Sequence, residues 1–259
     1  MYQAKRYIIN GQIDEASRLV MDKMHGKIKE KIFLEDSIEL LPAYFVLAEA
    51  NICLGGARLK KAEEFLIAAY WNLLKYKSDE SEKSGANADD SLVTPRELEQ
   101  FDACLHKTFG RLFLAQQKQE THKKALEELS QGIYLECKEH GPESIYLCSS
   151  YFYMGELFKQ EESIQKARSF FYKISTIWKK FIIEKDLQNM QYPMQSIIDQ
   201  YYYQEAFQHL QVIREFFETE FGPDNLLTAE TYMAYALVCL KLSQFGQCIE
   251  DLNRALMIF

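Results

Sequence analysis

The sequence lacks the local motifs that usually accompany catalysis or metal binding. It has no Cys-x-x-Cys pair among its six cysteines, no His-Glu-x-x-His, no phosphate-binding glycine loop and no Gly-x-Ser-x-Gly. Its five histidines are scattered, and no His/Cys cluster has the spacing of metal ligands. We therefore expect no enzyme activity, no catalytic residues, no cofactor and no metal site.

Proline, glycine and long apolar runs are also scarce. The chain has 5 prolines and 11 glycines in 259 residues, and signals for β-strands are nearly absent. Its longest apolar stretches, such as 40–47 and 145–154, are too short to cross a bilayer. No secretory leader opens the chain, and the cysteines have the spacing of free thiols in a reducing compartment. We expect a cytoplasmic protein without a disulfide framework and without a membrane partner.

Positive charge is in deficit as well. The formal net charge is −8, whereas sequence-independent nucleic-acid binding requires a basic surface. We therefore expect no nucleic-acid partner. The acidic surface either serves solubility or meets basic segments of partner proteins.

What the chain does contain is a small residue that recurs at a nearly constant step, each time within a similar apolar pattern. These residues are Ala16, Ala62, Ala125, Ala167, Ala206 and Cys248. A fixed step of about 34 to 45 residues is typical of α-solenoids. The pattern predicts an all-α tetratricopeptide-repeat superhelical solenoid of about six helix pairs. Its period is roughly 42 residues, and it forms a single domain over residues 1–259.

The fourth unit shows the pattern most clearly. Gly155 lies among large apolar residues of one helix, and Ala167 and Phe171 lie on the next helix. This arrangement predicts a narrow notch in the first helix, into which the second helix packs.

Two segments depart from the period. An acidic, polar stretch at about 78–93 is predicted to be a disordered insertion, after which Thr94 and Glu97 form a capping box. The fifth unit, at about 183–221, is predicted to be degenerate, because Pro193 and Met194 occupy the positions where the notch should lie.

Basic side chains suggest one candidate binding site. Lys107 and Arg111 are four residues apart and are predicted to face the same way on their helix. Chaperone-binding repeat domains use such a pair in a two-carboxylate clamp, but the preceding helix at 41–54 has no Lys or Arg. We therefore predict contacts with a partner segment in the concave groove and no chaperone-tail clamp.

Aromatic side chains suggest further contacts. Phe152 and Tyr153 are predicted at inner positions of the groove. The run Tyr201, Tyr202 and Tyr203 either begins the second helix of the degenerate unit, with one or two rings in the core, or anchors an interface.

The last helix suggests a third site. It carries Leu252, Leu256 and Phe259, and no polar capping helix follows. Repeat arrays need such caps for solubility. We predict that this terminal face meets another chain or further residues.

Several strings resemble the zinc finger MYND domain-containing protein 12 family over most of the chain. They are residues 40–44 (LLPAY), 47–50 (LAEA), 61–66 (KAEEFL) and 172–175 (YKIS). That family carries an N-terminal zinc finger with closely paired cysteines, and this chain has no cysteine before Cys53. The resemblance therefore covers only the tetratricopeptide repeats, and no zinc is assigned.

The resemblance implies a non-catalytic subunit of motile cilia, located in the cytoplasm, the cytoskeleton and the axoneme of the cilium. Such a protein helps assemble or dock a single-headed inner-arm dynein on the doublet microtubule. The implied partners are a tetratricopeptide repeat protein 29-like protein and an axonemal dynein heavy chain, with the microtubule contacted indirectly. The units also resemble those of kinesin light chains. The alternative is therefore an adaptor that binds peptide motifs of cargo or signalling proteins in its groove.

Overall fold

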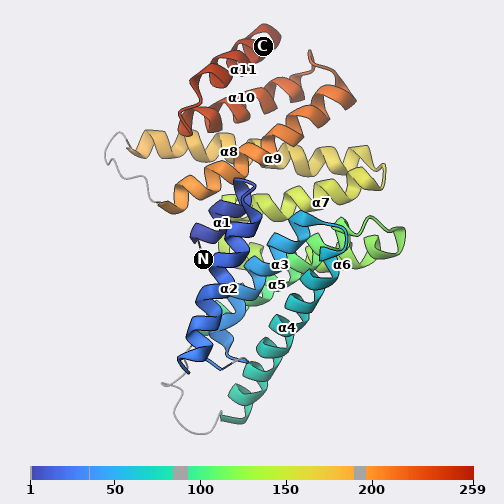
Figure 1. Cartoon of the computed structure of the whole chain (residues 1–259). Coiled ribbons are helices and arrows are strands. Elements are labelled where there is room, and N and C mark those ends of the chain that lie inside the picture. Colours follow the sequence, from blue (N-terminus) through green and yellow to red (C-terminus); the bar gives the residue numbers. More distant parts are fainter. Residues whose placement is uncertain (1, 35, 84–92, 190–196) are drawn as a thin grey trace. The chain divides into compact units, whose positions relative to one another are not determined.

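The computed structural model describes residues 2–34, 36–83, 93–189 and 197–259 (Figure 1). Within these ranges the regular secondary structure is helical throughout, and the helices pack mostly as neighbouring pairs. The all-α helical-repeat fold expected from the sequence is confirmed. The chain divides into two compact units, Met1–Glu139 and His140–Phe259, and each is described by itself.

The first unit consists of three helix pairs. Its elements are α1 (Tyr2–Ile9), α2 (Ile13–Lys29), the 3-10 turn η1 (Ile38–Leu40), α3 (Leu41–Leu54), α4 (Arg58–Lys83), α5 (Pro95–Ala115) and α6 (Gln119–His140), which ends one residue past the boundary. Helices α3, α4 and α5 enclose the main core, in which Leu41, Phe45, Leu66 and Leu73 are buried. A smaller core lies between α1, α2 and α3 around Ala16.

The second unit consists of two pairs and one single helix. Its elements are η2 (Ile145–Leu147), α7 (Cys148–Gln160), α8 (Ile164–Asn189), α9 (Ile197–Phe221), α10 (Leu226–Lys241) and α11 (Phe245–Ile258). Helix α9 has no paired helix before it in the described residues, and it packs on α10. Pro193 and Met194, on which the prediction of a degenerate unit depends, lie outside the described residues.

The recurring small residues lie at tight helix crossings. All six are buried, and a Cβ atom on Gly155 would come within 2.4 Å of the Phe171 ring. Likewise, a Cβ on Gly110 would come within 2.5 Å of Leu129. A Cβ atom at either position would force the Phe171 or Leu129 side chain to shift, because real Cβ atoms do not approach other atoms so closely. The notch predicted in the fourth repeat is confirmed at Gly155, and Gly110 forms a similar notch in the third repeat.

Helix starts also follow the sequence signals. Thr94 and Glu97 form the predicted capping box at the beginning of α5. Ser144 and Asn225 each accept a hydrogen bond from the backbone N–H two residues later. Helix α4, however, continues to Lys83, so its last six residues occupy the beginning of the segment predicted to be an insertion. Residues 84–92 of that segment lie outside the described residues, and Val93 at its end is buried.

Candidate protein-binding site

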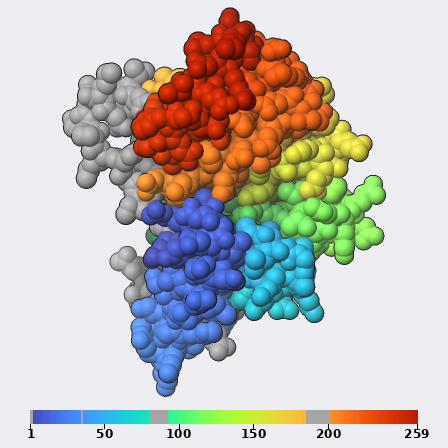
Figure 2. Space-filling model, turned by 45° about the horizontal axis from the view of Figure 1, so that its top comes forward, coloured from blue at the N-terminus to red at the C-terminus, as the bar shows by residue number. Residues whose placement is uncertain are grey.

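Helix α11 exposes an apolar stripe along its length. The residues of this stripe, called here the α11 stripe, are Phe245, Ile249, Leu252, Leu256 and Phe259. Phe245, Ile249, Leu256 and Phe259 are 59%, 60%, 72% and 57% exposed, and Leu252 is half-buried. Figure 2 shows α11, in red, on the surface of the second unit. Steps of four and three residues place the first four side chains on one face of the helix, and Phe259 continues the row at the C-cap.

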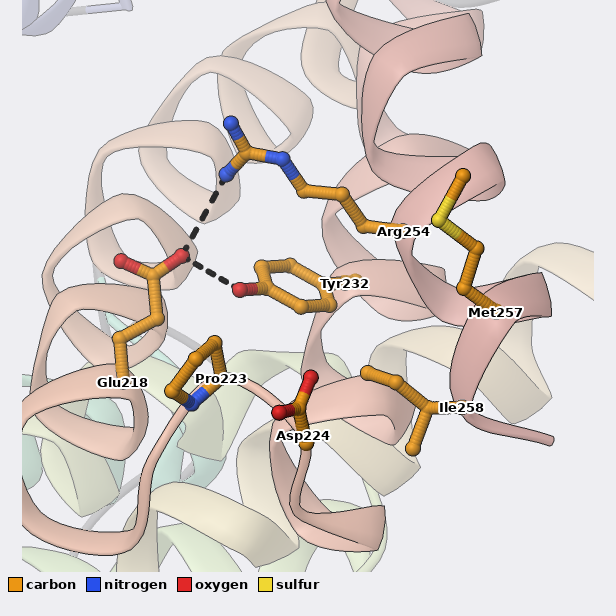
Figure 3. A pocket seen from close by; sticks show the side chains of 7 residues that line it. All are labelled: Glu218, Pro223, Asp224, Tyr232, Arg254, Met257 and Ile258. Atoms are coloured by element: carbon orange, nitrogen blue, oxygen red, sulfur yellow. Dashed lines mark hydrogen bonds and ion pairs between the residues drawn. The ribbon is translucent and has the colours of Figure 1, made fainter.

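The opposite edge of α11 borders a pocket of about 420 Å³ (Figure 3). Helix α9 contributes Glu218, α10 contributes Tyr232, and α11 contributes Arg254, Met257 and Ile258. Pro223 and Asp224, from the turn between α9 and α10, complete the wall. The pocket wall therefore contains apolar side chains together with two carboxylates and one guanidinium group.

One carboxylate organises the polar side of the pocket. Glu218 Oε1 accepts a 2.7 Å hydrogen bond from the Tyr232 hydroxyl and lies 3.6 Å from an Arg254 guanidinium nitrogen (Figure 3). Burial, together with this hydrogen bond, raises the pKa of Tyr232 to about 12. Arg254 also donates a 2.6 Å hydrogen bond to Glu250. The tyrosine therefore remains a neutral donor at physiological pH.

A buried ion pair fixes the inner side of α11. Arg214 of α9 lies 3.1 Å and 3.2 Å from the two carboxylate oxygens of Asp251, which is fully buried. Gln247 donates a further 2.8 Å hydrogen bond to the same carboxylate. Because α11 is held in one orientation on this side, its apolar stripe is presented to solvent as a fixed surface.

Lys107 and Arg111 lie on α5, facing neighbouring helices. Lys107 Nζ donates a 2.9 Å hydrogen bond to Glu136 of α6, and Arg111 lies 3.3 Å from Glu49 of α3. Their side chains are largely buried, and Glu49 is buried as well. Sequence spacing did not reveal the carboxylates that pair with these two cations.

Glu49 shows how strongly these charges are coupled. Burial acts to raise its pKa, but Lys5, Arg111 and Lys107 outweigh this effect, and the pKa lies below its usual range. A carboxylate of a bound peptide would have to compete with Glu49 for the same cations. The groove role of Lys107 and Arg111 stays a prediction.

The predicted groove aromatics pack against a histidine of the same unit. The Phe152 ring stacks on His209 with centroids 4.0 Å apart, and Tyr153 meets His209 edge-on at 6.0 Å. Phe152 is buried and Tyr153 half-buried. Tyr153 therefore has more area left for a partner than Phe152.

The tyrosine run lies one turn inside α9. Tyr201 and Tyr203 are buried, and the Tyr203 ring lies 5.7 Å from Trp178. Tyr202 is half-buried and meets Tyr146 edge-on at 5.1 Å. The interpretation with rings in the core holds for two of the three tyrosines.

One surface was missed by the sequence analysis. Ile67, Tyr70, Trp71 and Leu74 form an exposed apolar row on α4 in the first unit. The spacing of i, i+3, i+4 and i+7 is visible in the sequence, but the adjacent core positions Leu66, Ala69 and Leu73 have the same helical period. Because the exposed row and the core row alternate along the same stretch of sequence, only the folded structure shows which of the two faces solvent.

Over the part of the chain that the structure describes, no group of three His, Cys, Asp or Glu side chains has the geometry to hold a metal ion. His106 Nδ1 lies 2.7 Å from Glu128 in a side-chain contact between α5 and α6. Within the same ranges, no helix combines the length and apolar character that crossing a membrane requires.

The fold defines an all-α helical-repeat protein with an exposed apolar end on its last helix. No family model matches the chain. Among solved structures, the chain is similar to the crystal structure of BtubC (BKLC) from P. vanneervenii. The identity is 14% and the TM-score 0.38, over 96% of this chain and 90% of that chain.

Proposed function

We propose that this protein is a non-catalytic scaffold or adaptor that acts through protein–protein contacts. The observation that carries the proposal is the α11 stripe, a fixed row of apolar side chains exposed at the end of a helical repeat. Contiguous exposed apolar patches rimmed by polar groups mark protein interaction sites. Exposed Asn253 lies beside the stripe, and the ion pair of Glu250 with Arg254 lies farther round the helix.

The surface fits a helix better than an extended peptide. A row at steps of four and three residues forms a seam along the helix axis, which a second helix covers along its whole length. Large apolar residues carry most of the energy in such interfaces, and the polar rim sets orientation. A helical partner is therefore the expected class.

Within this class, we propose a role in motile cilia. The protein helps assemble or dock a single-headed inner-arm dynein on the doublet microtubule. The support is the resemblance of strings such as 40–44 and 61–66 to the zinc finger MYND domain-containing protein 12 family. The proposed partners are a tetratricopeptide repeat protein 29-like protein and an axonemal dynein heavy chain. The proposed location is the axoneme.

The test is depletion and rescue in a ciliated cell that expresses the protein. We expect depletion to lower the occupancy of one inner-arm density in cryo-electron tomograms of the axoneme, and the unmodified protein to restore it. Rescue with Leu256→Glu should fail, whereas rescue with Tyr134→Glu, an equally exposed position on α6, should succeed. Full occupancy of every inner arm after depletion would refute the ciliary role.

Affinity purification separates the two adaptor hypotheses. Recovery of axonemal dynein components, lost with Leu256→Glu, supports docking of the inner arm. Recovery of vesicle or motor-cargo proteins without axonemal components would favour the kinesin-light-chain-like alternative instead.

A further inference from the structure

The α11 stripe has an equivalent in the repeat that precedes it, and that equivalent is covered. Ala206 and Cys248 hold the same position in their repeats, 42 residues apart. With this offset, Tyr203, Leu210 and Phe217 of α9 correspond to Phe245, Leu252 and Phe259 of α11. The three residues on α9 are buried.

Helix α10 covers part of that equivalent row. The ring of Tyr235 stacks on Phe207 with centroids 5.2 Å apart, and the Arg214 guanidinium lies 4.9 Å from the same ring. Phe207 and Arg214 correspond to Ile249 and Leu256 of the α11 stripe. On α9, this face of the helix therefore packs against a following helix, α10. On α11, no helix of the described residues covers the equivalent face.

We propose that the occupant of the α11 stripe is a second copy of this chain, with two α11 helices packed together about a twofold axis. The inference rests on the proposed function, because it names a partner for the same surface. Three features of the stripe support a second copy: its pattern, its edges and its area.

The pattern is complementary to itself. Aromatic side chains occupy both ends of the stripe, at Phe245 and Phe259, and aliphatic side chains occupy the three positions between them. The mean spacing of 3.5 residues is that of helices that pair side by side. In a twofold interface the same patch serves both partners, so a row of this symmetry matches itself.

The edges of the stripe carry no charge. Gly246 and Asn253 flank it on the exposed side, and Cys248 and Ala255 flank it on the buried side. The exposed acidic side chain of α11, Glu250, is already paired with Arg254 on the same helix, and Asp251 is buried. Two copies of a chain with a net charge of −8 therefore meet here without opposing like charges.

The area suits a weak dimer. A fully buried aromatic side chain contributes about 150–250 Å². Because the two phenylalanines of the stripe are more than half exposed, and its aliphatic side chains add further exposed area, the stripe offers roughly 500 Å² of apolar surface per copy. Two copies with their polar rims would reach about 1,200 Å², where specific interfaces begin. At the lower end of interface sizes we expect weak association, with a dissociation constant on the order of 10 μM, so that the dimer forms only as concentration rises.

The experiment is sedimentation equilibrium of the full chain from about 1 to about 300 μM. We expect the mass to rise from monomer to dimer over this range. Leu256→Glu and Leu256→Lys should each raise the dissociation constant by about 100-fold, because each buries an unpaired charge in the apolar seam.

Tyr134→Glu is the matched control, since it adds the same charge at an equally exposed apolar position on α6. Its dimerisation should equal that of the unmodified chain, and circular dichroism checks that every variant is folded. A monomer at all concentrations, or a dimer that Leu256→Glu leaves intact, would overturn the proposal. A monomer whose Leu256→Glu variant still fails in ciliary rescue would leave the proposed function standing, with a different protein on the stripe.

Discussion

Helices α9 and α11 hold equivalent positions in successive repeats, but the equivalent row of side chains is more deeply buried on α9 than on α11. On α9, the row that includes Leu210 and Phe217 is buried. On α11, the corresponding row at Leu252 and Phe259 meets solvent on at least part of each side chain. The same helical position therefore serves stability in one repeat and is available for binding in the next. Stability is expected to depend on α9 and association on α11.

The largest expected effect comes from the ion pair that joins the two helices. Asp251→Ala leaves Arg214 mostly buried without its carboxylate partner, which should lower the free energy of unfolding by about 3–5 kcal/mol. Urea denaturation followed by circular dichroism measures this loss. Glu250→Ala on the same helix removes an exposed carboxylate and should cost less than about 1 kcal/mol. Equal losses in the two variants would show that the Arg214–Asp251 pair does not hold α11.

A matched pair of leucines tests the comparison directly. Leu210→Ala removes a fully buried side chain and should cost about 2–5 kcal/mol. Leu252→Ala should cost clearly less when stability is measured at a concentration that keeps the chain monomeric, because Leu252 is only half-buried. At high concentration the Leu252→Ala loss should grow if two copies cover the α11 stripe. Similar losses at low concentration would mean that the two rows are equally buried.

The fold was predictable from sequence because its determinants are local. A small residue such as Gly155, followed at fixed distance by Ala167, specifies a tight crossing of two consecutive helices. The capping box at Thr94 likewise needs only four consecutive residues. The chain-wide period then follows from repetition.

The candidate site was less predictable, because its charges and exposures depend on residues far apart in sequence. Arg111 meets Glu49 across 62 positions, and no local spacing announces that contact. Arg214 and Asp251 come from different repeats for the same reason. The sequence analysis anticipated the α11 stripe only at Leu252, Leu256 and Phe259, whereas the pocket on the opposite edge of α11 needs three helices to form.

A smaller effect is expected at the notch glycines. Gly155→Ala would place a Cβ atom 2.4 Å from the Phe171 ring, so α7 or the ring must move, at a cost of about 1–3 kcal/mol. Gly246→Ala on α11 meets no atom within 4 Å and should be neutral or stabilising by up to about 1 kcal/mol. Thermal denaturation of the two variants compares a glycine packed against a neighbouring helix with a glycine that has open space around it. A stabilising Gly155→Ala would contradict the tight crossing of α7 and α8.

The smallest effect is a pH dependence at the pocket, where α9 and α10 meet beside α11. The pKa of Tyr232 is raised from 10.0 to about 12, first by burial and then by its hydrogen bond to Glu218. Because the folded-state pKa exceeds the unfolded value, the stabilisation from the Tyr232 hydroxyl is fully present below pH 10 and is lost as the pH rises toward about 12. The stability difference between the unmodified chain and Tyr232→Phe should therefore be constant from neutral pH to about pH 9 and shrink above pH 10. Tyr134→Phe controls for the replacement of an exposed tyrosine. A difference that stays constant up to the highest pH at which the chain folds would mean that Glu218 does not hold the hydroxyl.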